Sequence, residues 1–547
     1  MKKERIFSVR SEQVEELRQR LGQRHLLESD WDLLDGLLLF LFRVLRSAEE
    51  MRLSLRRLQK LLFGKKTEKS PRGPEDPPPG DDEGPSPGSP TGAGPGPPAS
   101  DSSSRREQNH SEPSRPRGHG RMSASDYLAA ETIPCSHPNF EAQPACPRCG
   151  KGTLCRLRDP AVEIRILGSP VLTAKQYQLE RLRCSGCGAV LTAPLPPDAP
   201  REKYDARAKV LMALLKYGYG MPFYRLGQLQ GHLGVPLPPA TQWQLVEEVA
   251  NTVFPVYRAL KQMASQAKVL YADDSPIRIL SLMAENQGEP GPERRGMRTT
   301  ALIADLGEHS IYLYESGRKH AGDHLGDLLE RRPPDLAPPI QMTDALASNT
   351  RHGFPVHVTH CLLHGRRLFF EIQDFFPEIC GRVIDDIAKI YHFEDLAQKQ
   401  GLNPDQKLAF HQQHSGPVLE RLKSWLEEQW NQKQMEPNSS LGKATRYLLG
   451  HWEPLTGFLR IPGAPLDNNV SEQSLKLPIL NRKNSYFFKT QNGADVGSVL
   501  MSLIQTAIQA GANPVEYLVT LLEHSRQIRQ EPQLWLPWNY SPQKAAA

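Results

Sequence analysis

Residues 71–121 contain no Val, Ile, Leu, Met, Phe, Tyr, Trp or Cys, in a chain of 547 residues. Within this stretch, residues 71–104 hold 11 Pro, 7 Gly and 6 Ser. A segment of this composition cannot offset the entropy of ordering by burying apolar surface. We therefore expect a disordered linker over residues 67–121. Its basic distal part, RREQNHSEPSRPRGHGR, either touches DNA phosphates or is solvated.

Cysteine is also scarce, because eight cysteines are too few for a disulfide scaffold in a chain of this length. Four of them form two tight pairs, CPRCG and CSGCG, at Cys146, Cys149, Cys184 and Cys187. Each pair can place two thiolates on one tetrahedral ion. The strand-like segments VEIRIL and KQYQLERLRC lie between the pairs. We predict a zinc ribbon in residues 122–200, in which substitute ligands are available at Cys135, His137 and Cys155. Cys361 and Cys380 are expected to be small buried hydrophobes.

Long apolar runs and a strong net charge are absent too. The run LLDGLLLFLFRVL carries Asp35 and Arg43 and falls short of the ~20 apolar residues of a membrane span. The first residues lack the apolar core of a secretory signal. The net charge of only +5 does not indicate a protein that binds polyanions over its whole surface, so any nucleic-acid-binding surface must be local. We expect an intracellular, cytoplasmic protein associated with the nucleoid.

Two helical regions precede the main domain. Apolar residues from Leu37 to Leu62 follow a heptad seam, which predicts a self-associating coiled coil within residues 1–66. The alternative is a helix buried against its own protein. Residues 201–262 read as helix, Gly-Val turn and second helix, the spacing of a helix-turn-helix DNA-binding domain. Helical hairpins are common, so this pattern alone does not establish DNA binding.

From residue 263 the hydrophobic period changes to that of strands. KVLYADDSPIRILSL, MRTTALIADL and SIYLYES read as three strands, and PPIQMTD and PVHVTHCLL as two more after a helix. This order is typical of a ribonuclease-H-like α/β fold. We place the first part of the core at residues 263–374, a charged helical insertion at 375–460, and the last part with the C-terminal tail at 461–547. The chain is thus predicted to be a multidomain α/β protein.

Three acidic residues stand out by position. Asp273 ends the first strand, Asp344 ends the fourth, and Glu472 begins the helix after the insertion. Strands one and four are neighbours in a sheet of this order, so the two aspartates would face each other at the edge where open α/β sheets bind ligands. Clustered carboxylates need a cation, and hard oxygen ligands suit Mg²⁺ or Mn²⁺. Two such ions can promote phosphoryl transfer.

The chain resembles the transposases of the insertion-sequence-66 family, which have an Asp-Asp-Glu catalytic core. The resemblance runs from about residue 50 to 540. Its motifs occur in the family's order: LFGKKTEK, CPRCG…CSGCG, KYGYGMPFYR, YADDSP, QMTDALASN, CLLHGRRLFF, LDNNVSEQSLK…NRKNSYFF and LPWN.

The resemblance implies that Asp273, Asp344 and Glu472 are the metal-binding catalytic triad and that the paired cysteines bind zinc. It also implies short companion proteins encoded by the same element. Many members have Glu after the first catalytic Asp, whereas Asp274 follows here. Neighbouring strand residues point to opposite faces, so only one of the two can face the metals. The motif favours Asp273, with Asp274 as the alternative.

Basic residues close to these motifs are candidates for contacts to DNA. The alternative interpretation is that they are solvated or cap the sheet. The candidates are His364, Arg366, Arg367, Lys476, Arg482 and Lys483. Lys476 lies four residues after Glu472, which predicts a shared helical face. The aromatic run Tyr486, Phe487 and Phe488 is expected in the core.

Two functions of different class fit this pattern. The first is an active transposase that binds terminal inverted repeats as a homo-oligomer, then cleaves and joins target DNA. The second is a non-catalytic or domesticated DNA-binding protein that keeps the fold. The presence of all three acids favours the first. A structure-selective nuclease is a further alternative, but it would leave the end-binding regions without a task.

Overall fold

The computed structural model describes residues 11–23, 25–38, 41, 134, 151, 171–183, 187, 190–288, 292–350 and 353–540. The chain divides into two units, residues 1–66 with 171–547, and residues 67–170. The predicted linker, the coiled-coil seam beyond Leu41, and Cys146, Cys149 and Cys184 lie outside the described residues. Within the described ranges, no helix has the length and apolar character needed to cross a membrane.

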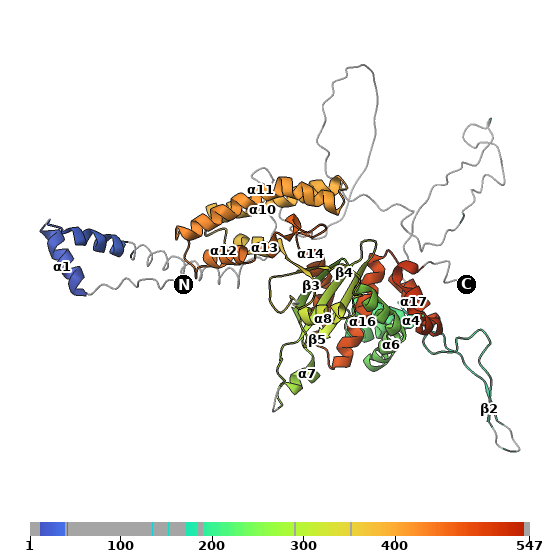
Figure 1. Cartoon of the computed structure of the whole chain (residues 1–547). Helices are drawn as coiled ribbons and strands as arrows, with labels where there is room; N and C mark the ends of the chain where they lie inside the picture. The colour runs from blue at the N-terminus through green and yellow to red at the C-terminus, as the bar shows by residue number, and fades with distance from the viewer. Residues whose placement is uncertain are drawn as a thin grey trace. The chain divides into compact units, whose positions relative to one another are not determined.

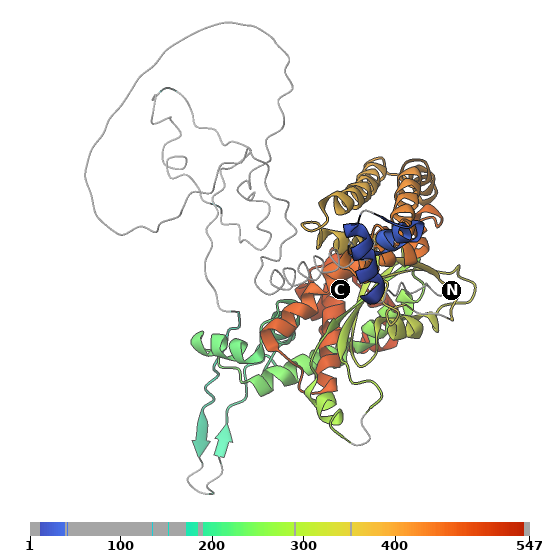
Figure 2. The same ribbon diagram turned by 90° about the vertical axis from the view of Figure 1, so that its left-hand side faces the viewer.

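The first described segments are short. The helix α1 spans Ser11–Gly22, and residues 28–38 are also helical. Strands β1 (Arg181–Arg183) and β2 (Val190–Thr192) pair as an antiparallel hairpin, drawn in teal in Figure 2. Cys187 lies exposed in the connection between them. One predicted zinc ligand is therefore at the end of a hairpin, while the coiled coil and the complete ribbon remain predictions.

A five-stranded mixed sheet is the centre of the main unit (Figure 1). The order is β5-β4-β3-β6-β7, in which β3, β4 and β5 are antiparallel and β6 and β7 run parallel to β3. The first and fourth predicted strands, β3 and β6, are neighbours, as the strand order required. The bounds are β3 Val269–Pro276, β4 Arg298–Asp305, β5 Ser310–Gly317, β6 Ile340–Thr343 and β7 His357–His360.

A long helix closes one edge of this sheet. The helix α16 (Gln491–Gln509) runs along β5, and its Ser498, Ser502 and Thr506 recur every four residues on one face. The Tyr312 N–H donates to Thr506 Oγ1 at 3.1 Å and the Tyr314 N–H donates to Ser502 Oγ at 2.8 Å. These hydroxyls occupy backbone groups that would otherwise be open for pairing with another strand. The edge is therefore capped from within the chain.

The predicted helix-turn-helix region forms four elements: α4 Ala206–Ala213, η2 Leu214–Gly218, α5 Phe223–His232 and α6 Pro239–Ala264. The turn between α5 and α6 contains Gly234 at φ +78°, a conformation that favours glycine. The inner face of α6, which includes Val246, Val253 and Leu260, joins the same hydrophobic core as α16 and the sheet. The two helices thus pack with the sheet in one unit.

The region predicted as a helical insertion is helical. Its inner residues, among them Ile387, Leu422 and Leu448, form a second hydrophobic core, which also includes Val269 of β3 and Ile340 of β6. The helix α13 and the turn η3 contact β7, which anchors the insertion to the sheet. The bounds are α9 Leu362–Phe370, α10 Pro377–Lys399, α11 Pro404–Asn431, α12 Ser440–Gly450, α13 Trp452–Leu455 and η3 Gly457–Leu459.

The remaining elements are α7 Leu280–Glu285, α8 Ala321–Leu329, α14 Asn469–Ser474, α15 Lys476–Ser485, α17 Pro514–Glu523, α18 Ser525–Gln530, η4 Pro532–Trp535 and η5 Pro537–Asn539.

Candidate active site

The first two acids of the site come from adjacent parallel strands. The register pairs Tyr271 of β3 with Met342 of β6. Asp273 and Asp344 each follow these residues by two positions, so both lie just beyond the paired part of the two neighbouring strands. Asp344 follows the end of β6, whereas Asp273 lies within β3, opposite Ala301 of β4, so the prediction that it ends the first strand was wrong. The Asp344 Oδ1 accepts hydrogen bonds from the Leu346 N–H and from Asn349 Nδ2, at 3.2 and 3.0 Å. Local hydrogen bonds therefore fix the Asp344 carboxylate beside β3.

The third acid, Glu472, is carried by the short helix α14, which is tied to the sheet by the residue before it. Asn468 is fully buried, and its Nδ2 donates to the Ala272 carbonyl at 3.0 Å. That carbonyl belongs to the residue immediately before Asp273. The sequence PLDNNVSEQSLK therefore has a structural purpose beyond starting a helix, since Asn468 brings the helix bearing Glu472 against β3.

A second contact holds the other end of α14. Pro478 has no N–H, so the Ser474 carbonyl loses the helical partner that would lie four residues later. The Tyr314 hydroxyl donates to that carbonyl at 2.9 Å. A buried carbonyl left unpaired would be costly, and the tyrosine of β5 satisfies it. As a result the segment divides into α14 and α15 at Leu475. Leu475 itself keeps right-handed helical dihedral angles, with φ −63° and ψ −14°, so the shared face of Glu472 and Lys476 stays a prediction.

The charges of Asp344 and Glu472 act on the Asp273 carboxyl. Burial raises the pKa of Asp273 to about 7; a hydrogen bond from the Asp274 N–H opposes the rise, and the negative charges of Asp344 and Glu472 add to it. Both charges thus lie within reach of Asp273. Like charges held together in a half-buried place stabilise a bound cation, and carboxylate oxygens are the ligands that Mg²⁺ and Mn²⁺ prefer. The donor set therefore fits a hard divalent ion.

Asp274 faces a different environment. Its Oδ1 accepts from the Thr300 hydroxyl and its Oδ2 from the Ala321 N–H at 3.1 Å, at the start of α8. Arg298 Nε lies 3.6 Å from the same Oδ2. Both carboxylate oxygens are thus engaged in joining β3 to β4 and α8. Of the two adjacent aspartates, Asp273 is the one grouped with Asp344 and Glu472.

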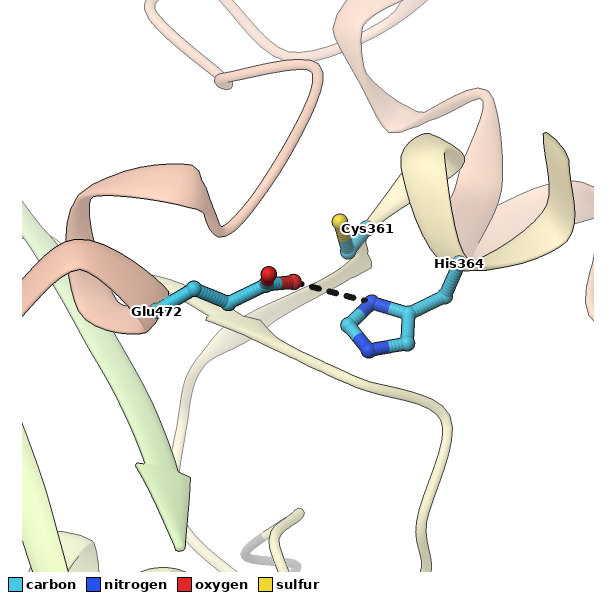
Figure 3. A group of neighbouring side chains, drawn as sticks. All are labelled: Cys361, His364 and Glu472. Carbon is cyan, nitrogen blue, oxygen red and sulfur yellow. Dashed lines mark ion pairs between the residues drawn. The ribbon is translucent and has the colours of Figure 1, made fainter. Parts of the chain in front are cut away.

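The helix α9 contributes His364 from its first turn and Arg367 from its last turn to the surroundings of Glu472. Figure 3 shows His364 beside Glu472. His364 Nδ1 lies 3.7 Å from Glu472 Oε1, and Arg367 Nη2 lies 3.8 Å from Oε2. The Cys361 N–H donates to the Thr343 carbonyl at 3.0 Å, directly before Asp344. This bond places the α9 N-terminus at the end of β6. The histidine and arginine can therefore hold the Glu472 carboxylate in one orientation.

Cys361, His364 and Glu472 also form a group that could hold a metal ion, since one ligand atom from each lies within 4.8 Å of the others. Cys361 is fully buried as expected, and burial raises the pKa of its thiol to about 12. A protonated thiol is a poor ligand, which counts against Cys361 as a ligand. Among the described residues, Asp273 and Asp344 do not belong to a group whose ligand atoms converge to this distance. The sequence analysis missed the proximity of Cys361 to the site. Its three-residue spacing from His364 at a helix start was the available signal.

The other predicted basic residues are less close to the acids. Arg366 stacks on Phe370, with its guanidinium carbon 5.6 Å from the ring centre. Arg482 Nη1 donates to Ser275 Oγ at 3.1 Å and also to the Pro276 carbonyl, so it attaches α15 to the end of β3. Lys476 and Lys483 are exposed on α15. The structure therefore groups His364 and Arg367 with Glu472 and leaves the other four around it.

Replacing Tyr314 with phenylalanine tests the support of α14. Tyr314→Phe leaves the buried Ser474 carbonyl without a donor, and we expect a loss of about 1–2 kcal/mol in the free energy of unfolding. Urea unfolding of the variant and the parent measures the loss. The matched control is Tyr312→Phe on the same strand, because the Tyr312 hydroxyl makes no side-chain hydrogen bond within the described part of the chain. Equal losses in both variants would contradict this role.

Comparison with known protein families identifies the class. Residues 203–496 match the family described as "Transposase IS66 family". The match spans more than half of the chain and includes all three carboxylates. The protein therefore belongs to the IS66 family of transposases, the enzymes of insertion sequences. Membership in this family implies DNA as a partner and the use of divalent metal ions.

The chain is also similar to curated proteins of Sinorhizobium fredii (strain NBRC 101917 / NGR234). It is 27% identical to "Uncharacterized protein y4jD" over 414 residues, which cover 72% of this chain and 77% of the relative. It is 26% identical to "Uncharacterized protein y4hP" over 431 residues, which cover 74% and 75%. These likenesses extend over most of both chains and carry no functional detail of their own.

Proposed function

We propose that this protein is an Asp-Asp-Glu transposase that cleaves DNA strands at the ends of its element and joins them to target DNA. The observation that carries the proposal is the placement of Asp273 and Asp344 on neighbouring parallel strands with Glu472 on α14 beside them, close enough for the charges of Asp344 and Glu472 to act on Asp273. We further propose that the core is ribonuclease-H-like. The order β5-β4-β3-β6-β7, with three antiparallel strands followed by two parallel ones, supports this assignment.

The three carboxylates would hold Mg²⁺ or Mn²⁺ in this site. Two such ions would activate a water molecule or a 3′-hydroxyl and stabilise the leaving oxygen of the phosphodiester. The protein's own groups set the geometry. Asn468 and Tyr314 position α14, while His364 and Arg367 orient the Glu472 carboxylate. The Arg367 guanidinium also suits the geometry of a phosphate.

The regions before the core would bind the element's ends. We propose that residues 122–200 form a zinc ribbon with Cys146, Cys149, Cys184 and Cys187, and that residues 201–262 read terminal inverted repeats. The hairpin β1–β2 with Cys187 in its connection supports the ribbon, and the α5–turn–α6 arrangement supports the reading of DNA. Self-association through the N-terminal helix and companion proteins of the same element belong to this proposal. The alternative of a non-catalytic relative is disfavoured because all three acids are present together.

The proposal is tested by strand joining on DNA that carries the element's ends, with Mg²⁺ or Mn²⁺. Glu472→Gln keeps the shape of the side chain and removes one charge, so we expect joining to fall by orders of magnitude while DNA binding and folding persist. The matched control is Glu420→Gln, an exposed glutamate on α11. Joining by Glu472→Gln within a few-fold of the parent would remove Glu472 from the site.

A further inference from the structure

The aromatic run after α15 is exposed, which corrects the expectation that it lies in the core. The side chains of Tyr486 and Phe487 are 68% and 49% exposed. Only Phe488 packs inward, where its N–H donates to the Arg278 carbonyl at 2.8 Å. Two adjacent aromatic rings are therefore exposed to solvent at the end of a helix. Packing in a hydrophobic core does not explain why these two side chains are large.

The backbone at this point is strained. Tyr486 has φ 63° and ψ −40°, and among the described residues Lys433 is the other non-glycine residue with positive φ. Such a conformation costs a bulky residue on the order of 1–3 kcal/mol and persists where the surroundings enforce it. The Tyr486 N–H bonds to the Arg482 carbonyl at 2.8 Å, and the Phe488 bond to Arg278 fixes the other side. Strain of this kind is concentrated at binding sites, and here it presents Tyr486 outward.

A hollow beside the aromatic pair is positively charged. Its lining includes the cations Lys216, Arg278 and Arg482, together with Tyr486 and Phe487, and contains no carboxylate. Lys216 is only 6% exposed, its Nζ donates to Ser485 Oγ at 2.7 Å, and it forms no ion pair in the described part of the chain. Burial lowers the pKa of Lys216 to about 8, so the side chain remains largely cationic at neutral pH. The Lys216 Nζ also lies 5.4 and 5.5 Å from the centres of the Tyr217 and Phe223 rings, so this buried cation is held within the fold and adds positive charge beneath the surface.

The position of this surface relates it to the carboxylates. Arg482 bonds to Ser275 and Pro276, which follow Asp273 by two and three residues on β3. The hollow and the aromatic pair therefore adjoin the strand that carries the first acid. A nucleotide held here would belong to the same DNA strand as the phosphate at the carboxylates, or to its immediate neighbour.

We propose that Tyr486, Phe487 and the adjoining cationic surface bind an unpaired nucleotide of the DNA, with the base stacked on the aromatic rings and a phosphate at the exposed Arg278. Aromatic stacking accepts any base, and the cations neutralise the backbone. This inference rests on the proposed function, because it requires that the two DNA strands separate locally beside the site where the protein cleaves DNA. A protein partner is the competing occupant, but a hollow lined by three cations and no acid favours a polyanion.

The test uses the full chain without divalent ions and two DNA probes of the same sequence. One is a blunt duplex, and the other has a short unpaired tail that contains the fluorescent base 2-aminopurine. We expect the parent to prefer the tailed duplex and to quench the tail's fluorescence by stacking. Tyr486→Ala with Phe487→Ala should abolish the quenching and weaken tail binding by about 5- to 100-fold, without changing blunt-duplex affinity. The matched control is Leu534→Ala, a half-exposed apolar side chain outside the proposed DNA-binding region, which should change neither.

Two further variants separate binding from folding. Tyr486→Gly relieves the positive φ, so it should raise the melting temperature while tail binding falls. Arg278→Gln removes the exposed cation beside the rings, so it should leave the melting temperature unchanged while tail binding loses part of its salt dependence. A fall in melting temperature for both would indicate a purely structural role and overturn the proposal.

The outcomes are distinguishable. If the parent binds both duplexes equally and does not quench 2-aminopurine, the nucleotide site is wrong while DNA binding stands. If it binds neither duplex, the proposed function itself fails. If the double variant keeps all DNA binding but loses self-association, the surface is a protein interface, which also overturns the proposal.

Discussion

Asp273→Asn is expected to abolish strand joining and, at the same time, to stabilise the fold. The pKa of this carboxyl is about 7 in the folded chain against 3.8 for the free group, so the ionised form destabilises the folded state above pH 7. At roughly 1.4 kcal/mol per pKa unit, removing the charge should raise the free energy of unfolding on the order of 2–4 kcal/mol. Joining should fall by orders of magnitude, because a metal-binding charge is lost.

The direction of this change in stability can be checked by varying the pH. Because the folded pKa is raised, the stability of metal-free parent protein should increase as pH falls from about 7 towards 4, and the increase should be smaller in Asp273→Asn. Adding Mg²⁺ at neutral pH should raise the melting temperature of the parent and have little effect on the variant. Thermal unfolding with and without EDTA measures both.

The neighbouring aspartate provides a matched control. An amide has one acceptor oxygen, whereas the two oxygens of Asp274 accept from Thr300 and Ala321. Asp274→Asn is therefore expected to lower stability. If Asp273→Asn joined DNA within a few-fold of the parent, or if both variants lost stability alike, Asp273 would not be the first acid of the site.

Gly497→Ala is expected to destabilise the protein by about 1–3 kcal/mol through overpacking. A Cβ atom at this position of α16 would lie 2.7 Å from Tyr217 Cε1 and 3.3 Å from Phe488 Cε1. Tyr217 is only 1% exposed and cannot withdraw. The helix propensity of alanine offsets part of the cost but not all of it. Chemical denaturation of the variant measures the loss.

The same substitution elsewhere in α16 should have the opposite sign. A Cβ at Gly493 would meet Thr490 Oγ1 at 3.5 Å, which is ordinary contact. Gly493→Ala should therefore be neutral or stabilising by up to about 1 kcal/mol. If the two variants were equally stable, the close approach of Tyr217 to α16 would not be a constraint on the fold.

Much of the sheet could be predicted from the sequence, because strands carry local patterns. The alternation and turns before and after YADDSP and QMTDA predicted the strands that became β3 and β6. Once the strand order was inferred, the adjacency of Asp273 and Asp344 followed from topology alone. The division at Leu475 was also open to prediction, since Pro478 removes a helical hydrogen bond.

The placement of α14 could not be predicted in this way. The bonds that fix it join Asn468 to Ala272 and Tyr314 to Ser474, across 196 and 160 residues of sequence. No local pattern reports which buried carbonyl a distant side chain will meet. Tyr486 was unpredictable for another reason, because intrinsic preferences place bulky residues away from positive φ. The contacts around Tyr486 override that preference, so Tyr486 and Phe487 are exposed although they belong to an aromatic run.

The insertion between β7 and α14 also has a consequence in time. Asp344 and Glu472 are separated by 472 − 344 = 128 residues. At synthesis rates of about 5–20 residues per second, a nascent chain spends roughly 6–25 s with two acids and no third. The helix α16, which caps the open edge of β5, follows later still. Completion of the three-carboxylate site thus waits until most of the chain has been translated, which delays its assembly relative to the appearance of its first acids.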